Sequence, residues 1–584
     1  MHPYRKDIDG LRAIAVISVI LFHFGVLPNG YLGVDVFFVI SGYLITGIIY
    51  ADAIESRFSI KQFYLRRIRR IIPLIVFVSL VSLVVGLLVM LPDDLENLSQ
   101  SVVATNLFCN NVLQLITTRN YWDVVNEYKP LMHTWSLGVE EQFYLFFPLL
   151  FLIPGQRKVR WILPILCILT IVSILLFCIP AFSNADKFYL LPFRFFELSL
   201  GGICSIGADE RRLSQGCSPV FIILLGCLLF APLPAAHQHL LLILTVVVTA
   251  VILMTANGAN KISVLALHNP VITGIGKISF SLYMWHQVAL VYTRYVFTQH
   301  LTLASSIGIL LAITVLSVLS YRFIEQPFRD KTRVNNTMLL WTVGFTSLVT
   351  ICAALYIYER AGVVRDVPEL EITKDHAQRN MHAQYNAAVN SQDKAFDASA
   401  KTKILVIGNS FARDWVNVLN QSSYKNQLDI SYAPRLARTK DMLQKISGAD
   451  YIFFSETDRQ ALRHYYRAFG VDTTKAWCVG TKNFGVNNGV FYNHWSDANH
   501  CLQRTKIDES FIDLNTRLKQ EWGNKYVDLL GSVIDSDSSV PVFTPDCKFI
   551  SQDCRHFTRA GAAYFARLLE RDTTFILEHL SHCK

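Results

Sequence analysis

Long apolar segments repeat along the first three fifths of the chain, and short polar stretches separate them. A membrane-spanning helix needs about 20 mostly apolar residues. The pattern therefore predicts a polytopic α-helical membrane domain with about 11 transmembrane helices. The first segment lacks a small-x-small cleavage site and is interpreted as a span rather than a signal peptide. The predicted spans are 11–28, 32–50, 71–91, 136–153, 161–180, 190–207, 218–234, 240–256, 271–297, 303–323 and 337–357.

The pattern changes after residue 358. Residues 359–400 are polar with few bulky apolar side chains, which predicts a linker, and residues 401–584 resemble a water-soluble domain. Short apolar runs there alternate with helical patterns, which is typical of an α/β domain with a mainly parallel sheet. The sequence thus divides into a membrane domain (1–358), a linker (359–400) and an α/β domain (401–584). Strands are predicted at 404–407, 449–455, 476–480 and 525–530.

Composition supports this division. The chain is 52% hydrophobic and 17% charged, with a mean hydropathy of +0.33, which excludes a disordered chain and a purely soluble one. The net charge of +9 does not indicate nucleic-acid binding, because basic residues cluster between apolar runs and no known nucleic-acid reader motif accompanies them.

The distribution of basic residues predicts the orientation. Basic residues are abundant in segments that share a side with the N-terminus and scarce in the alternate loops, so we place the N-terminus in the cytoplasm. An odd number of spans then puts the α/β domain outside. We therefore expect a multi-pass protein of a bacterial inner membrane with a periplasmic α/β domain.

Five cysteines lie in the predicted outer domain, where an oxidising compartment permits disulfides. Pairing cannot be deduced from sequence; our guess is Cys547 with Cys554 and Cys478 with Cys501. Zinc binding is not expected, because no paired CxxC spacing appears.

Arg12 and His23 share the first predicted span. They are eleven residues apart, about three helical turns, so they lie on one helix face. Charged groups inside a membrane are functional candidates by default. One hypothesis is an anionic donor held near Arg12 and proton transfer at His23; the alternative is an arginine that sets topology and a histidine satisfied by a neighbouring helix.

Other ionisable residues also lie within predicted spans or beside them. Some must form ion pairs to be tolerated there, and such a structural role is at least as plausible as a catalytic one. FYLRRIRRIIP carries four arginines, which are either a topology signal or a clamp for the phosphates of a cytoplasmic cofactor. These candidates are Asp35, Arg66, Arg67, Arg69, Arg70, Glu140, Glu141, Arg194, Glu197, His286, Arg322 and Glu325.

Six motifs in order carry a family resemblance over about residues 5–330. They are DGLRAIAVISVILFHF, GYLGVDVFFVISGYLIT, FYLRRIRRIIP, WSLGVEEQFYLFFP, ISFSLYMWHQ and YRFIEQPFR, and together they resemble the acyltransferase-3 family of membrane acyltransferases. The resemblance implies transfer of an acyl group, usually acetyl from cytoplasmic acetyl-CoA, to a cell-surface carbohydrate. It marks Arg12 and His23 as central and associates Arg66 to Arg70 with the donor. We expect His23 to be a general base or transient acyl acceptor, since an imidazole can take up a proton near neutral pH.

The α/β domain carries a candidate catalytic triad. Ser410 follows the first predicted strand on a strand-to-helix turn, where a hydroxyl is exposed near a helix N-terminus. Asp553 and His556 are three residues apart, just before a helix that Thr558 is expected to cap. His556 would activate the hydroxyl and Asp553 would orient the imidazole. Each motif alone is also typical of a surface turn; their order in one α/β unit favours the triad.

These two motifs resemble the SGNH (GDSL-like) hydrolase and acyltransferase family over about residues 401–584. The first block here is GNS where GDS is common. The resemblance implies an oxyanion hole completed by a Gly and an Asn from separate blocks. Gly480 and Asn483 in VGTKNFG are the candidates, although their spacing departs from GxN and Asn483 could instead be a turn residue.

A chain that combines these two domains resembles bacterial O-acetyltransferases. They imply transfer of acetyl from acetyl-CoA to a hydroxyl of a surface polysaccharide or lipid-linked glycan, with lipopolysaccharide O-antigen first and peptidoglycan second. The expected partners are acetyl-CoA, that glycan and the lipid bilayer, with no metal and no nucleic acid. Two alternatives stay open: a polysaccharide O-acetyl esterase, and a transporter of a lipid-linked sugar, although no internal repeat of the transporter kind is evident.

Overall fold

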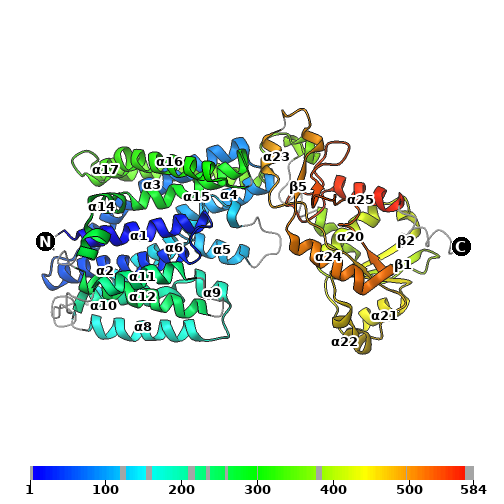
Figure 1. The fold of residues 1–584 in the computed structure, drawn as a ribbon, viewed down its shortest axis with the longest axis horizontal. Coiled ribbons are helices and arrows are strands. Elements are labelled where there is room, and N and C mark those ends of the chain that lie inside the picture. Colours follow the sequence, from blue (N-terminus) through cyan, green and yellow to red (C-terminus); the bar gives the residue numbers. More distant parts are fainter. Residues whose placement is uncertain are drawn as a thin grey trace. The chain divides into compact units, whose positions relative to one another are not determined.

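The computed structural model describes residues 4–118, 126–152, 159, 161–207, 218–231, 237–256, 261–298, 300–376, 385–494 and 496–571. Internal contacts divide the chain into two units (Figure 1), each described by itself. The helical unit comprises Met1–Leu88, Asn97–Arg294 and His300–Tyr356. The sheet unit comprises Val89–Glu96, Tyr295–Gln299 and Ile357–Lys584.

Helical segments lie at each of the predicted spans. Among the residues that the structure describes, six helices are long and apolar enough to cross a membrane: Gly30–Ile54, Ile60–Val89, Asn184–Gly207, Gln238–Thr255, Leu303–Arg329 and Asn336–Glu359. Ile162–Cys178 and Ser218–Phe230 are shorter apolar helices. The number of eleven spans stays a prediction. The helices are α1 (Lys6–His23), α2 (Gly33–Ile54), α3 (Ile60–Val89), α4 (Pro92–Asn106), α5 (Asn110–Thr118), α6 (Trp135–Phe146), α8 (Ile162–Cys178), α9 (Asn184–Tyr189), α10 (Leu191–Gly207), α11 (Ser218–Phe230), α12 (Gln238–Thr255), α13 (Lys261–Ser263), α14 (Pro270–Lys277), α15 (Ser279–Val296), α16 (Leu303–Ser320), α17 (Gln326–Arg329) and α18 (Asn336–Glu359).

Glycines let α2 and α10 approach closely. A side chain at Gly42 would collide with the backbone of Leu198, and one at Gly201 would collide with the backbone of Val39. Small residues at such a contact allow two helix backbones to pack tightly where apolar burial alone cannot drive association, as in a membrane. The tight α2–α10 pair also brings buried polar groups of the two helices within reach of each other.

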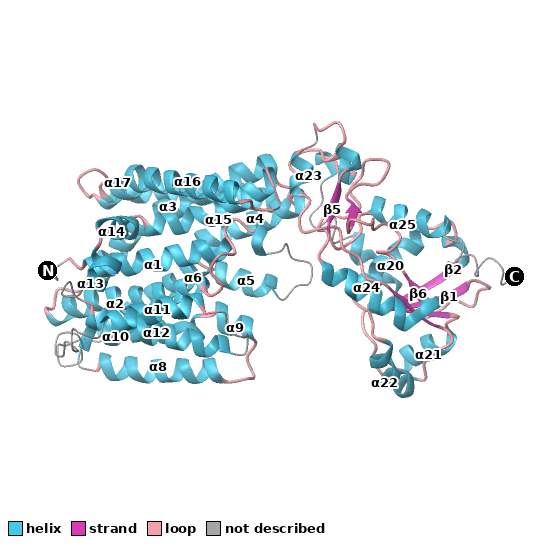
Figure 2. Ribbon diagram, viewed as in Figure 1, coloured by secondary structure: helices cyan, strands magenta, loops and turns pink. Residues whose placement is uncertain are grey.

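A five-stranded parallel sheet forms the centre of the sheet unit (Figure 2). Its strand order is β2-β1-β3-β4-β6. Strands were predicted at β1, β3, β4 and β6, and the parallel sheet is confirmed; β2 and a small antiparallel pair, β5 with β7, were missed. The strands are β1 (Thr402–Ile407), β2 (Leu428–Ala433), β3 (Tyr451–Ser455), β4 (Ala476–Val479), β5 (Arg504–Lys506), β6 (Tyr526–Val527) and β7 (Ser539–Pro541).

Helices cover both faces of this sheet. Because side chains alternate along a strand, Ile404 and Val406 of β1 pack in one core with residues of α20 and α25, and Leu405 and Ile407 pack in another with residues of α21. The helices of the unit are α20 (Ser410–Gln421), α21 (Lys440–Gly448), α22 (Arg459–Phe469), α23 (Gly489–Asn493), α24 (Glu509–Trp522) and α25 (Arg559–Arg571).

The described part of the predicted linker packs on the sheet unit. Val389 is buried in the core that holds α20, and Asp393 accepts a hydrogen bond of 2.5 Å from Lys445 of α21. Residues 377–384 of the predicted linker lie outside the described residues. The domain boundaries 358/359 and 400/401 stay predictions.

Both guessed disulfides are wrong. The structure pairs Cys501 with Cys547, whose Cα atoms are 5.0 Å apart, a normal distance for a disulfide. Cys478 lies on β4 inside a core, and burial raises its pKa to about 12, so it remains a protonated thiol. Cys554 is also a buried free thiol, and burial raises its pKa well above the usual value. These two cysteines fill space in the apolar interior, whereas the bonded pair ties two loops together.

Candidate functional site

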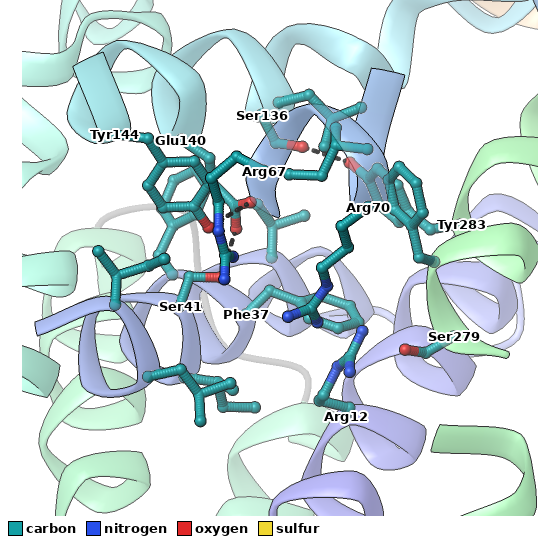
Figure 3. Close-up of a pocket in the computed structure, with 18 residues that line it drawn as sticks. Arg12, Phe37, Ser41, Arg67, Arg70, Ser136, Glu140, Tyr144, Ser279 and Tyr283 are labelled. Carbon is teal, nitrogen blue, oxygen red and sulfur yellow. Dashed lines mark hydrogen bonds between the residues drawn. The ribbon is translucent and has the colours of Figure 1, made fainter. Parts of the chain in front are cut away.

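A cavity lies within the helical unit (Figure 3). Arg12 of α1 and Arg67 and Arg70 of α3 contribute its cationic groups, and Glu140 of α6 its carboxylate. Figure 3 shows the side chains of Arg12 and Arg70 pointing toward each other. The remaining wall is mainly apolar, from Val34, Phe37, Phe38, Ile40, Leu44, Ile45, Ile71, Leu137 and Phe280. The cavity therefore suits a ligand with an anionic end and a less polar arm.

The cationic groups of this cavity are poorly neutralised by the protein. Arg70 has no hydrogen-bond partner among the residues that the structure describes, and Arg12 approaches Asp9 only to 3.9 Å. The buried Nε of Arg67 likewise lacks a hydrogen-bond partner in the described chain. Glu140 is occupied by Ser41 at 2.9 Å and Tyr144 at 3.2 Å, which donate to its two oxygens. Guanidinium groups with free donors are suited to phosphate, which they can bind bidentately.

The other two arginines of FYLRRIRRIIP do not line this cavity. Arg66 is half-exposed and lies 3.4 Å from Asp52. Arg69 is buried and donates to the carbonyl oxygens of Phe328 and Val334, at 2.9 and 2.7 Å, and to the side chain of Asn336. Arg69 thus ties α3 to α17, to the segment after α17 and to the start of α18. Of the four arginines predicted to bind the donor, Arg67 and Arg70 line the cavity, whereas Arg66 forms a surface ion pair and Arg69 connects structural elements.

Three histidines gather beside this cavity. The ring centroid of His286 lies 5.2 Å from that of His23 and 5.1 Å from that of His133. Tyr283 connects the cluster to the cavity, because it lines the cavity and its hydroxyl donates to the carbonyl oxygen of His133 at 2.8 Å. His23 and His286 were predicted from their spans; His133 and Tyr283 were missed. His133 stands two residues before the WSLGVEEQFY motif, so a longer reading of that motif would have included it.

The remaining embedded candidates do not line the cavity. Arg194 forms buried ion pairs with Asp35 at 2.8 Å and Glu197 at 3.0 Å, which fits the ion-pair alternative. Glu325 lies on a π-helical turn (Tyr321–Glu325), accepts a hydrogen bond from Ser281 and pairs with Arg329 at 2.7 Å. Arg322 of the same turn is exposed and lies over the ring of Phe323, and Glu141 is half-buried beside Glu140.

In the sheet unit, Ser410, His556 and Asp553 are within hydrogen-bonding distance. His556 Nε2 lies 2.9 Å from Ser410 Oγ, and His556 Nδ1 lies 2.5 Å from Asp553 Oδ2. Ser410 begins α20 directly after β1, and Thr558 caps α25 by accepting a hydrogen bond from Gly561 N at 3.0 Å. Asp553 Oδ1 also accepts from His556 N at 2.8 Å, which fixes the carboxylate. This arrangement can activate a serine hydroxyl for nucleophilic attack on an acyl group.

A buried ion pair stabilises the triad, and the sequence did not predict it. Lys482 and Asp414 are both fully buried and 2.7 Å apart. Asp414 lies one turn after Ser410 and accepts from Phe557 N at 3.1 Å, while Lys482 donates to the carbonyl oxygen of Arg555. A buried charge that loses its partner costs about 3–5 kcal/mol. The pair therefore holds the loop of His556 against α20.

Gly480 and Asn483, the residues predicted for the oxyanion hole, make different contacts. Gly480 N donates to Val527 O at 2.9 Å, as part of the sheet, so this N–H is not directed at a substrate. Asn483 Oδ1 accepts from Gly485 N at 2.9 Å, in the manner of a turn residue. The next residue, Phe484, donates its N–H to Cys554 O, so Asn483 stays near the triad loop. The contact to Gly485 fits the alternative that Asn483 is a turn residue, and its role in an oxyanion hole stays a prediction.

The pKa of His556 predicts the pH dependence of this site. Burial lowers the pKa of His556 from its usual value of 6.5, and the carboxylate of Asp553 opposes this without reversing it. A general base must be unprotonated, so Ser410-dependent activity should persist below pH 6.5 and fall only at more acidic pH. The profile of kcat/KM against pH for an acetyl ester tests this; an acidic limb centred at pH 7 or above would contradict it.

The comparisons with known proteins agree on one group. The family profile described as an acyltransferase domain (Acyl_transf_3) matches residues 5–358. The chain is 31% identical over 358 residues to the peptidoglycan O-acetyltransferase OatA of Listeria monocytogenes, covering 57% of this chain and 57% of that protein. It is 29% identical over 352 residues to the O-acetyltransferase OatA of Staphylococcus aureus, covering 56% and 58%. The chain thus spans less than two thirds of the length of these relatives. No solved structure matches it.

Proposed function

The chain belongs to the acyltransferase-3 family, and from this premise we propose that it is a membrane O-acetyltransferase of bacterial surface glycans. It takes acetyl from cytoplasmic acetyl-CoA and esterifies a hydroxyl of a polysaccharide on the other side of the bilayer. The N-terminus is cytoplasmic and the sheet unit periplasmic in this proposal. The basic residues between the apolar segments support that orientation.

The arginine-lined cavity is the observation that carries the proposal. Acetyl-CoA combines phosphate groups with a long, weakly polar arm that ends in an activated thioester. Arg12, Arg67 and Arg70 offer free guanidinium donors for phosphates, and the apolar wall formed by α2 and Phe280 of α15 offers a surface for the arm. The ring of His23 contacts that of His286, which in turn contacts Tyr283 of the cavity wall, and this proximity supports a proton-transfer role for His23.

The second half of the proposal assigns the sheet unit to transfer onto the glycan. Ser410 accepts the acetyl group, directly or through an intermediate, and passes it to a sugar hydroxyl. The serine–histidine–aspartate arrangement supports this role, because it activates an alcohol in either direction of ester exchange. An SGNH-like fold for this unit remains part of the proposal.

The acceptor is proposed as a cell-surface polysaccharide. The sequence resemblance placed lipopolysaccharide O-antigen first and peptidoglycan second. One relative carries the name peptidoglycan O-acetyltransferase, which makes peptidoglycan an acceptor to test on equal terms.

The deciding experiment follows labelled acetyl through the full-length protein. Membrane vesicles that contain it are given acetyl-CoA with a labelled acetyl group, and the label is measured on O-antigen and on peptidoglycan. Protein-dependent ester on either glycan supports the proposal and identifies the acceptor. Removal of existing acetyl groups would instead indicate an esterase, and loss of the polysaccharide itself would indicate a transporter.

Substituting the cavity arginines should weaken donor use selectively. Arg70→Ala removes a guanidinium that has no hydrogen-bond partner among the described residues, so the fold loses little while phosphate contacts are lost. We expect the KM for acetyl-CoA to rise about 10-fold or more, since a charge-assisted hydrogen bond contributes about 1.5–3 kcal/mol. The same measurement on Arg66→Ala is the matched control, because Arg66 pairs with Asp52 outside the cavity. Equal KM values for the two variants would contradict a donor role for the cavity.

A further inference from the structure

The side-chain amide of Asn409, next to the catalytic serine, has a fixed orientation. Asn409 caps the N-terminus of α20, and its Oδ1 accepts from Phe411 N at 3.0 Å. The hydroxyl of Ser455, at the end of the neighbouring strand β3, donates to the same Oδ1 at 3.1 Å. A backbone N–H can only donate, so the oxygen must face the helix and the NH₂ group must face away from it.

The NH₂ group of Asn409, the residue before Ser410, is therefore a free donor among the described residues. Asn409 is exposed, and its Nδ2 has no hydrogen-bond partner among the described residues. An aspartate, common at this position in the SGNH family, could offer only acceptors here when ionised.

An oxyanion hole at Ser410 needs donors that the predicted residues do not fully supply. The N–H of Gly480 is used in the sheet, as described above. The backbone N–H of Ser410 itself, the first of α20, has no acceptor in the part of the chain that the structure describes, and the first N–H groups of a helix have no intrahelical partner. One further donor beside Ser410 would complete a two-donor site.

We propose that Asn409 Nδ2 is that donor, and that the asparagine of the GNS block binds the acyl oxyanion together with Ser410 N. The inference rests on the proposed role of Ser410 in acyl transfer. Ser410 Oγ attacks the acyl carbonyl carbon, its proton passes to His556 Nε2, and the π electron pair of the carbonyl moves onto oxygen. Asn409 Nδ2 and Ser410 N donate to that oxygen. When the carbonyl reforms, the leaving oxygen or sulfur departs with the proton from His556.

The test separates loss of the donor from loss of the helix cap. Asn409→Asp and Asn409→Ser both keep an oxygen that can accept from Phe411 N, and both remove the NH₂ group. The serine variant does so without adding a negative charge. For the full-length protein in detergent, with 4-nitrophenyl acetate as the ester, we expect both variants to lower kcat by about 10²–10³-fold. KM and the thermal unfolding midpoint should stay near those of the unmodified protein.

Two further variants make the result decisive. Asn483→Asp keeps the turn contact to Gly485 and removes the amide donor of the residue that the family resemblance favours. A fall in kcat for Asn483→Asp with no fall for the Asn409 variants would overturn the inference. The inference would also be overturned if kcat of both Asn409 variants stayed within threefold of that of the unmodified protein. It would be overturned as well if a variant had a lowered unfolding midpoint and regained kcat when assayed at a temperature below that midpoint. In each of these cases hydrolysis that disappears in Ser410→Ala leaves the proposed function standing. Absence of any Ser410-dependent turnover would overturn both.

Discussion

Replacing Ser410 with alanine is expected to abolish acetyl transfer to the glycan. His556 Nε2 is 2.9 Å from Ser410 Oγ, and the side chain has no neighbour in the triad that could take over as nucleophile. Removing a nucleophile of this kind lowers kcat by at least about 10⁴-fold. The measurement is the ester content of the surface glycan, by NMR, in cells that express the variant in place of the original protein.

Mass spectrometry of the sheet unit, after proteolysis of the purified protein incubated with acetyl-CoA, should find an acetyl adduct on Ser410. The matched control is Ser447→Ala, because Ser447 is an exposed serine of α21 whose hydroxyl donates to Gln444 O. That variant should retain both the adduct and the glycan ester. Full glycan acetylation in Ser410→Ala, with no adduct in the original protein, would eliminate the acyl-serine step.

The sheet could be predicted where its strands are uniformly apolar. β1 and β3 read as apolar runs, and both were found within a few residues of their bounds. β2, whose sequence is LDISYA, was missed because Asp429 and Ser431 interrupt the apolar pattern. Both side chains are buried and satisfied by the preceding segment: Asp429 accepts from Asp397 N, and Ser431 donates to Lys394 O. Such partners are distant in sequence, so a local pattern cannot indicate them.

The candidate sites divide in the same way. Asp553 and His556 are neighbours in sequence, so their spacing alone placed them together. The ion pair of Asp414 and Lys482 joins residues of α20 and of the loop after β4, and the pair Cys501–Cys547 joins two loops. The different roles of Arg69 and Arg70 could not be predicted from the sequence pattern either, because they depend on which carbonyl groups lie next to α3. Tertiary contacts decided these features, while periodicity decided which segments became helices and strands.

Replacing His23 with alanine should abolish acylation while the protein still inserts into the membrane. His23 ends α1 and contacts only one other ring of the described histidine cluster, that of His286, at 5.2 Å. Loss of a general acid–base group lowers a rate by about 10²–10⁴-fold. If His23 acts on the acetyl group before Ser410 does, the variant should also lack the acetyl adduct on Ser410. The adduct measurement therefore distinguishes a role of His23 before Ser410 from a failure of transfer from Ser410 to the glycan.

His237→Ala is the matched control, since His237 is exposed at the start of α12 and its side chain makes no capping hydrogen bond. It should keep the glycan ester and the Ser410 adduct at the original levels. Comparable amounts of all three proteins in the membrane fraction establish that insertion is unaffected. Undiminished acetylation in His23→Ala would remove His23 from the reaction and leave the histidine cluster with a packing role. A Ser410 adduct that persists without glycan ester would instead place His23 after Ser410 or outside the acetyl route, because the donor would then reach the serine without it.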